Sequence, residues 1–163
     1  MKTLSMKFCL GMCLAAVFVS ARTFAEDKAD HLAVVVNKSV KLDDVSSGDL
    51  QKYFKADKSK TPDGTKIIIV MIDVGHPERD AALKYIYKMS ESEYTEFFVS
   101  ATFTGAVQAA PKALPSAAAM KKYIADTPGA IGYIRASDAD DTVKVLKVDG
   151  KAPGEAEYSL KMK

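Results

Sequence analysis

The sequence predicts an α/β domain in which a mixed β-sheet carries helices on both faces. Candidate strands and helices follow one another in the order β-α-β-α-α-α-β-β, and alternation of this kind is typical of α/β layering. The segment KIIIVMID, residues 66–73, is almost uninterrupted apolar sequence. A strand has this composition when helices cover both of its faces.

The first half of the chain supplies a strand and a helix. The β-branched run HLAVVVN, residues 31–37, has the length of a strand. SSGD, residues 46–49, matches a capping box, which satisfies the free amides at the start of a helix. The short helix that follows presents one apolar face made of Leu50, Tyr53 and Phe54.

Two helices are expected after the second strand. Pro77 is a favoured first helical residue, and the helix that it opens has one apolar stripe, made of Ala82, Tyr85, Ile86 and Met89. SESE, residues 90–93, offers a second capping box and predicts a new helix. The apolar residues of that helix are Tyr94, Phe97, Phe98 and Ala101, at helical spacing.

The last part of the chain is expected to return to the sheet. Residues 102–115 read as a connecting loop, after which Ser116 caps a helix that turns Ala117, Met120 and Ile124 inward. TPG ends that helix, and AIGYI, residues 130–134, is the next strand. TVKVLKVDG, residues 142–150, alternates as a half-exposed edge strand does. The tail after Pro153 is polar and expected to be loose.

The N-terminus predicts export to the periplasm. Lys2 and Lys7 precede an apolar run, residues 8–19, that is too short to cross a bilayer comfortably. We expect a signal peptide at residues 1–25, cleaved before Glu26, and a single domain at residues 26–163. Both cysteines leave with the signal, so the mature chain has no thiol chemistry.

Charge and residue types exclude several function classes. Cleavage removes three of the 23 basic residues and none of the 21 acidic ones, which leaves a net charge of 20 − 21 = −1. A nucleic-acid partner is therefore not expected. His31 and His76 are far apart in the sequence, and neither has a cysteine near it. No metal site is therefore expected. No nucleophile motif, catalytic set or cofactor motif is present, which favours a non-enzyme.

The turn between residues 73 and 80 is the first candidate site. Gly75, His76 and Arg79 surround a predicted helix start, where free amides and the helix dipole attract anions. A cation in the first turn, such as Arg79, is unfavourable unless something negative pairs with it. The alternative is a structural corner, with Arg79 bonded to Asp73 or pointing into water. As a surface residue Arg79 should contribute little to stability, so we expect Arg79→Ala to change it by no more than about 0.5 kcal/mol.

Five segments together resemble a known family. LAVVVNKSV, VSSGDLQKYF, DGTKIIIVM, FTG and TPGAIGYI occur in the order found in one lobe of the periplasmic phosphate-binding proteins of ABC importers. The most specific match is PGAIGY, residues 128–133, and the resemblance covers residues 30–135. It implies a single lobe of a type 2 periplasmic-binding-protein-like fold, since the family's proteins are twice as long and close two lobes on the ligand.

The resemblance also bears on the candidate ligands. It places Thr104 and Gly105 near the ligand cleft, and Asn37 ends a strand from which it can face a ligand; the alternative for all three residues is turn formation. The family grips phosphate with a Ser-Gly-Thr turn. The matching segment DVGHPERDA has no Ser or Thr between Asp73 and Asp80.

Two functions follow from these observations. The first is a non-catalytic periplasmic solute-binding-like protein that binds phosphate or another small anion in connection with ABC-type transport. The second is a periplasmic interaction or sensor-accessory module that has lost ligand binding. A lone lobe leaves uncovered the surface that a second lobe would close on. Such a surface suits a homodimer or a periplasmic or membrane protein partner.

Overall fold

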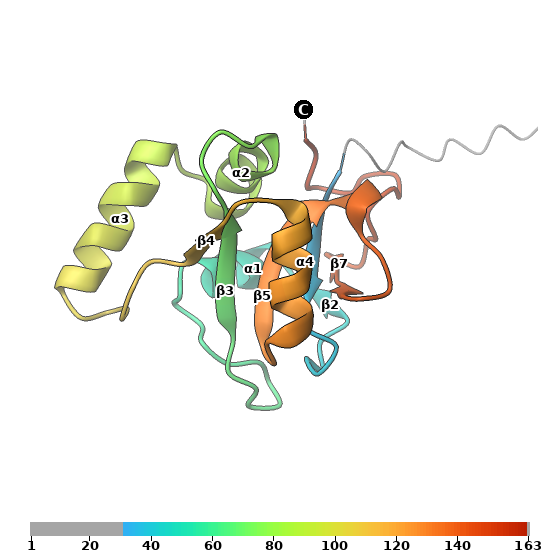
Figure 1. Ribbon diagram of the computed structural model, residues 1–163, viewed down its shortest axis with the longest axis horizontal. Helices are drawn as coiled ribbons and strands as arrows, with labels where there is room; N and C mark the ends of the chain where they lie inside the picture. Colours follow the sequence, from blue (N-terminus) through green and yellow to red (C-terminus); the bar gives the residue numbers. More distant parts are fainter. Residues whose placement is uncertain (1–30, 163) are drawn as a thin grey trace, which may run out of the picture.

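The computed structural model describes residues 31–162 of the protein (Figure 1). The predicted signal peptide and its cleavage site lie outside these residues. The helical elements are α1 (Ser47–Phe54), α2 (Pro77–Ala82), the π-helix η2 (Leu83–Tyr87), α3 (Glu91–Phe103), α4 (Ala117–Asp126) and the 3₁₀-helix η3 (Ala136–Asp138). The strands are β1 (Leu32–Val36), β2 (Asp44–Val45), β3 (Ile68–Ile72), β4 (Lys112–Leu114), β5 (Ala130–Arg135), β6 (Lys144–Val145) and β7 (Lys147–Val148).

Five strands form one mixed sheet in the order β4-β3-β5-β1-β6. β3 runs parallel to β4 and β5, whereas β1 runs antiparallel to β5 and β6. All five residues of β1 are fully buried, in agreement with a strand covered on both faces. The predicted mixed sheet is confirmed.

Helices cover both faces of the sheet, as predicted. α4 lies in front of β5 and α1 lies behind the sheet (Figure 1). Because side chains alternate along a strand, Gly132 faces α4 while Tyr133 faces the other layer, where its ring lies 6.1 Å from that of Phe54. A Cβ atom on Gly132 would lie 2.6 Å from the Met120 sulfur, so the missing side chain lets α4 approach closely.

The first glycine of the PGAIGY segment has a different role. Gly129 has a φ of +80°, and a Cβ atom there would lie 2.1 Å from the carbonyl oxygen of Lys66. Its own carbonyl accepts a 3.0 Å hydrogen bond from Ile68 N at the start of β3. Glycine at this position therefore lets the beginnings of β3 and β5 meet.

The helix opened by Pro77 differs from the prediction in its second half. It continues as the π-helix η2 and ends at Lys88, which has a left-handed backbone with a φ of +55°. The wider π turn rotates the following side chains relative to an α-helix. As a result Tyr87 is completely buried, and Tyr85 and Met89 of the predicted stripe are only partly buried.

Two predictions about irregular segments are wrong. Residues 102–115 were expected to be a loop, but they include the end of α3 and strand β4, which adds parallel to β3. The tail was expected to be loose, yet Tyr158 and Leu160 are buried. Tyr158 Oη donates a 2.9 Å hydrogen bond to the carbonyl of Leu32, which ties the tail to β1.

The predicted edge strand is divided in two. β6 pairs with β1 at the edge of the main sheet, as expected. β7 pairs instead with β2 in a separate two-stranded parallel sheet. Among residues 31–162, no helix combines the length and the apolar composition that a membrane span requires.

Candidate functional site

The turn between β3 and α2 is open to solvent. Val74 is 68% exposed, and Gly75 has a φ of +91°, with no atom within 4 Å of where its Cβ would lie. His76 is the N-cap of α2 and makes no side-chain capping bond. Within the described part of the chain, no hydrogen bond uses the backbone N–H of Gly75 or His76. The turn therefore presents free amide donors at the start of a helix.

Arg79 does not point into this turn. Its side chain is buried, with Nε 2.7 Å and Nη2 2.6 Å from the two carboxylate oxygens of Glu91. Nη1 donates a 2.9 Å hydrogen bond to the carbonyl of Ile72 at the end of β3. The guanidinium also lies 5.1 Å from the ring centre of Tyr94. The negative group that accompanies Arg79 in the first turn is thus a carboxylate of the protein itself.

This ion pair changes the acidity of both partners. The bonds from Arg79 hold the pKa of Glu91 below its usual range, and the carboxylate raises the pKa of Arg79. The expectation that Arg79 bonds Asp73 or projects into water is therefore wrong. It is wrong because α3 turns back beside α2 and brings Glu91, twelve positions along the chain, against the guanidinium.

A second ion pair holds the other side of the same helical turn. Glu78 is buried, and its Oε1 accepts hydrogen bonds of 3.1 Å from Nε and 3.0 Å from Nη2 of Arg135, at the end of β5. The two residues that follow Pro77, Glu78 and Arg79, therefore both fasten α2 to its neighbours. The exposed charge that remains in the first turn is the carboxylate of Asp80.

Asn37 lies at the other end of the strands from the turn before α2. β1 runs antiparallel to β5 and β3 runs parallel to it, so β1 and β3 end on opposite sides. The Asn37 amide nitrogen donates to the carbonyls of Ile124, at 2.7 Å, and Ala125, at 2.9 Å, in the last turn of α4. Its Oδ1 accepts a 2.8 Å hydrogen bond from Ser39 N. The side chain joins α4 to the loop after β1, which matches the alternative of a turn former.

Thr104 and Gly105 lie beyond the far end of α3. Thr104 Oγ1 donates to the carbonyls of Ser100, at 3.0 Å, and Ala101, at 3.2 Å. Gly105 has a φ of +74°, and its N–H donates to the carbonyl of Thr102. This arrangement is a helix C-terminus closed by a left-handed glycine. The predicted site residues therefore lie at three separate places: Gly75, His76 and Arg79 at the start of α2, Thr104 and Gly105 after α3, and Asn37 after β1.

The partners of the two arginines are the residues that sequence reasoning missed. Glu91 was visible only as the first residue of a helix, and Glu78 only as a favourable acid in a first turn. Arg135 lies 57 positions from Glu78. No local pattern connects residues at these separations, because the directions of α3 and β5 decide which side chains meet.

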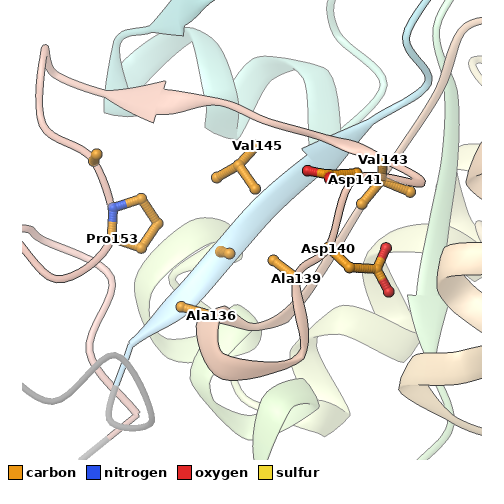
Figure 2. Close-up of a pocket in the computed structure, with 9 residues that line it drawn as sticks. Ala136, Ala139, Asp140, Asp141, Val143, Val145 and Pro153 are labelled. Carbon is orange, nitrogen blue, oxygen red and sulfur yellow. The ribbon is translucent and has the colours of Figure 1, made fainter.

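A hollow of about 430 Å³ lies between the segment after β5 and the C-terminal tail (Figure 2). Its wall consists of small apolar side chains together with Asp140 and Asp141. The Asp140 carboxylate turns away from Val145 and Pro153 (Figure 2) and bonds Lys121 Nζ at 2.6 Å. That bond and those from Thr142 hold the pKa of Asp140 well below its usual range. Residues 31–162 contain no His, Cys, Asp and Glu group placed to hold a metal ion.

Comparison with known proteins identifies relatives of one kind. No family model matches the chain. It is 32% identical over 123 residues to the phosphate-binding protein PstS of Bacillus subtilis, a match that covers 75% of this chain and 37% of that protein. This match spans most of the described domain.

Solved structures share the fold. PstS of Borrelia burgdorferi superposes with a TM-score of 0.62 at 17% identity, over 81% of this chain and 54% of that one. A phosphate ABC transporter substrate-binding protein of Clostridium perfringens, solved with bound phosphate, gives 0.62 at 21% identity, over 76% and 47%. An ABC-type phosphate transport receptor of Vibrio cholerae gives 0.57 at 18%, over 76% and 48%. The chain thus spans about half the length of these structures.

Proposed function

We propose a function from the premise that this chain belongs to the family of phosphate-binding receptors of ABC transporters. The proposed function is that of a non-catalytic periplasmic solute-binding-like protein that binds phosphate or another small anion. The observation that carries the proposal is the 32% identity to a phosphate-binding protein over 123 residues. The fold shared with the solved receptors supports it. Periplasmic location would follow from cleavage before Glu26, which mass spectrometry of the exported protein tests directly.

The turn at Gly75 and His76 is the anion site that the geometry supports best. Its backbone amides are free among the described residues, and the N-terminus of α2 orients the helix dipole toward an anion. The imidazole of His76 adds a side-chain donor. Pro77 supplies no N–H, and Arg79 is occupied by Glu91. An anion here therefore meets fewer hydrogen-bond donors than a Ser-Gly-Thr turn with a free arginine provides. We expect its binding to be weak for this reason.

A titration of phosphate-stripped protein tests the proposal. Phosphate or sulfate at a hundred times the dissociation constant adds about 2.7 kcal/mol of stability, so the unfolding temperature should rise with the logarithm of the anion concentration above that constant. His76→Asp places a carboxylate at the site and should abolish the rise, while aspartate remains a good helix cap. Ser116→Asp is the matched control, because it also introduces a carboxylate at a helix N-cap, that of α4. A flat titration with both anions would reject the proposal.

A second candidate function is a protein-interaction module that has lost ligand binding. The observation that favours it is the burial of Arg79 against Glu91, together with the lack of hydroxyl residues between Asp73 and Asp80. A flat titration favours this function if cross-linking in intact cells also gives a discrete species of higher mass. A flat titration with the protein monomeric in cells rejects both functions.

A further inference from the structure

The ion pair between Arg79 and Glu91 has one buried partner and one exposed partner. The side chain of Arg79 is 6% exposed, whereas the side chain of Glu91 is 40% exposed. Glu91 is the first residue of α3, which extends to one side of the molecule (Figure 1). The guanidinium is therefore fixed inside the domain, and the carboxylate that covers it is in contact with solvent.

Other contacts hold the guanidinium in its position without Glu91. Nη1 donates a 2.9 Å hydrogen bond to the carbonyl of Ile72, and the ring centre of Tyr94 lies 5.1 Å from Cζ of Arg79. The remaining edge of the planar group carries Nε and Nη2, the two nitrogens that bond Glu91. This edge is a preorganised pair of donors, and an arginine binds carboxylates and phosphates through such a pair in the same geometry.

A hollow of about 550 Å³ opens beside the Glu91 carboxylate. Glu91 is one of its lining residues, together with Lys84 and Lys88. Asp80 and Glu93 also line it, so the lining carries two positive and three negative charges. Glu91 thus supplies the charge that makes the hollow net negative. Withdrawal of its carboxylate leaves a balanced hollow with the two free nitrogens of Arg79 behind it.

The packing of α3 does not need the Glu91 carboxylate. The rings of Tyr94 and Phe98 lie against Tyr87, with their centres 5.1 Å and 6.4 Å from its ring centre. The capping box at the start of the helix also uses other side chains. The carboxylate of Glu91 can therefore rotate away from Arg79 while α3 stays packed against the domain.

We propose that Glu91 is an internal anion on the Nε and Nη2 edge of Arg79, and that a bound oxyanion takes its place there. The ligand is an anion with two oxygens that fit this edge, such as phosphate or sulfate. The exchange occurs at the base of the turn that contains Gly75 and His76, because Arg79 bonds the carbonyl of Ile72. This inference rests on the proposed anion-binding function and adds the residue that sets its affinity.

The exchange selects anions that offer two oxygens at once. Glu91 places one oxygen 2.7 Å from Nε of Arg79 and the other 2.6 Å from Nη2. Phosphate and sulfate reproduce both bonds, whereas chloride has no second acceptor atom. Chloride at equal ionic strength therefore screens the ion pair without replacing the carboxylate.

Nuclear magnetic resonance of the arginine side chains tests the exchange in the whole protein. Arg79 and Arg135 are the arginines of residues 31–162, and the Nε–H signal that Arg135→Lys removes identifies both. Phosphate should shift the Arg79 signal saturably. It should leave the signal of Arg135 in place, although that residue is paired with a carboxylate of Glu78 in the same way. Sodium chloride at the same ionic strength should not produce the shift.

Glu91→Gln tests the competition, because it keeps the shape of the side chain and removes its charge. The dissociation constant of phosphate measured at Arg79 should fall at least fivefold, which corresponds to about 1 kcal/mol. Glu96→Gln is the matched control, since it removes the same charge from an exposed position of α3. The control should leave the dissociation constant unchanged. Circular dichroism verifies that both variants are folded.

The Arg79 signal and the turn amides separate the possible failures. An Arg79 signal that stays fixed in both the wild type and Glu91→Gln, or equal strengthening by Glu91→Gln and Glu96→Gln, would overturn the inference. If phosphate shifts the backbone amides of Gly75 and His76 in the wild type while the Arg79 signal stays fixed in both proteins, the proposed function stands and the exchange is rejected. If phosphate shifts none of these signals in either protein, both are rejected.

Discussion

Replacing Arg79 with alanine should destabilise the protein strongly. The substitution leaves the Ile72 carbonyl, at the buried end of β3, without the 2.9 Å bond from the guanidinium. Loss of a partner for a buried acceptor costs about 1–3 kcal/mol. The pair with Glu91 adds about 1 kcal/mol, because the side chain of Glu91 is 40% exposed and water replaces part of the interaction. The total is about 2–4 kcal/mol.

Urea unfolding followed by far-UV circular dichroism measures this loss. The urea concentration at the unfolding midpoint should fall. The slope of the unfolding free energy against urea concentration should stay constant, since the folded state remains compact. A loss of 3 kcal/mol lowers the thermal midpoint by roughly 10 °C for a domain of this size. Glu91→Gln is the comparison variant, and it should cost less because Arg79 keeps its bond to Ile72. A change below about 0.5 kcal/mol for Arg79→Ala would refute the structural role.

The same pair predicts a dependence on acid. Arg79 depresses the pKa of Glu91 from its ordinary value of 4.5. A carboxylate with a depressed folded pKa stabilises the protein above its unfolded pKa, and this contribution disappears as the pH falls through the folded pKa. The wild-type protein should therefore lose more stability than Arg79→Ala when the pH is lowered from 5 to about 3.

Three further substitutions test the packing of the fold by the same urea assay. Gly129→Ala should cost several kcal/mol or prevent folding, because its Cβ would overlap the carbonyl of Lys66 at a positive φ; a neutral effect would contradict the close approach of β3 and β5. Asn37→Ala should cost about 2–3 kcal/mol by removing three hydrogen bonds of about 1 kcal/mol each, and unchanged stability would show that α4 is not held there. Removal of residues 154–163 should cost about 3 kcal/mol or more with the loss of buried Tyr158 and Leu160, whereas a truncated chain as stable as the full one would restore the view of a loose tail.

Local patterns were sufficient for most of the elements. The apolar run before Asp73 predicted a strand covered on both faces, and β3 is an interior strand of the sheet, between β4 and β5. Ser90 and Glu93 form both bonds of the predicted capping box at the start of α3. Signals of this kind act within a few residues, so they survive in any tertiary arrangement.

Elements that depend on distant partners were not predicted. β4 is three residues long and gains its strand conformation from pairing with β3. The π turn at Leu83 and the burial of Tyr158 likewise depend on what packs against them. Short segments with weak patterns carry too little local information to show such contacts.

What the sequence by itself determined is the α/β layering and the helix caps, because each rests on local conformation or on the alternation of buried residues. What only the tertiary structure decided is the use of the charged and polar residues. Arg79 faces Glu91 and not solvent, and Asn37 holds α4 at the edge of the sheet opposite Gly75. The reason is physical: a charge or an amide takes its role from the partner that the fold brings within about 3 Å of it.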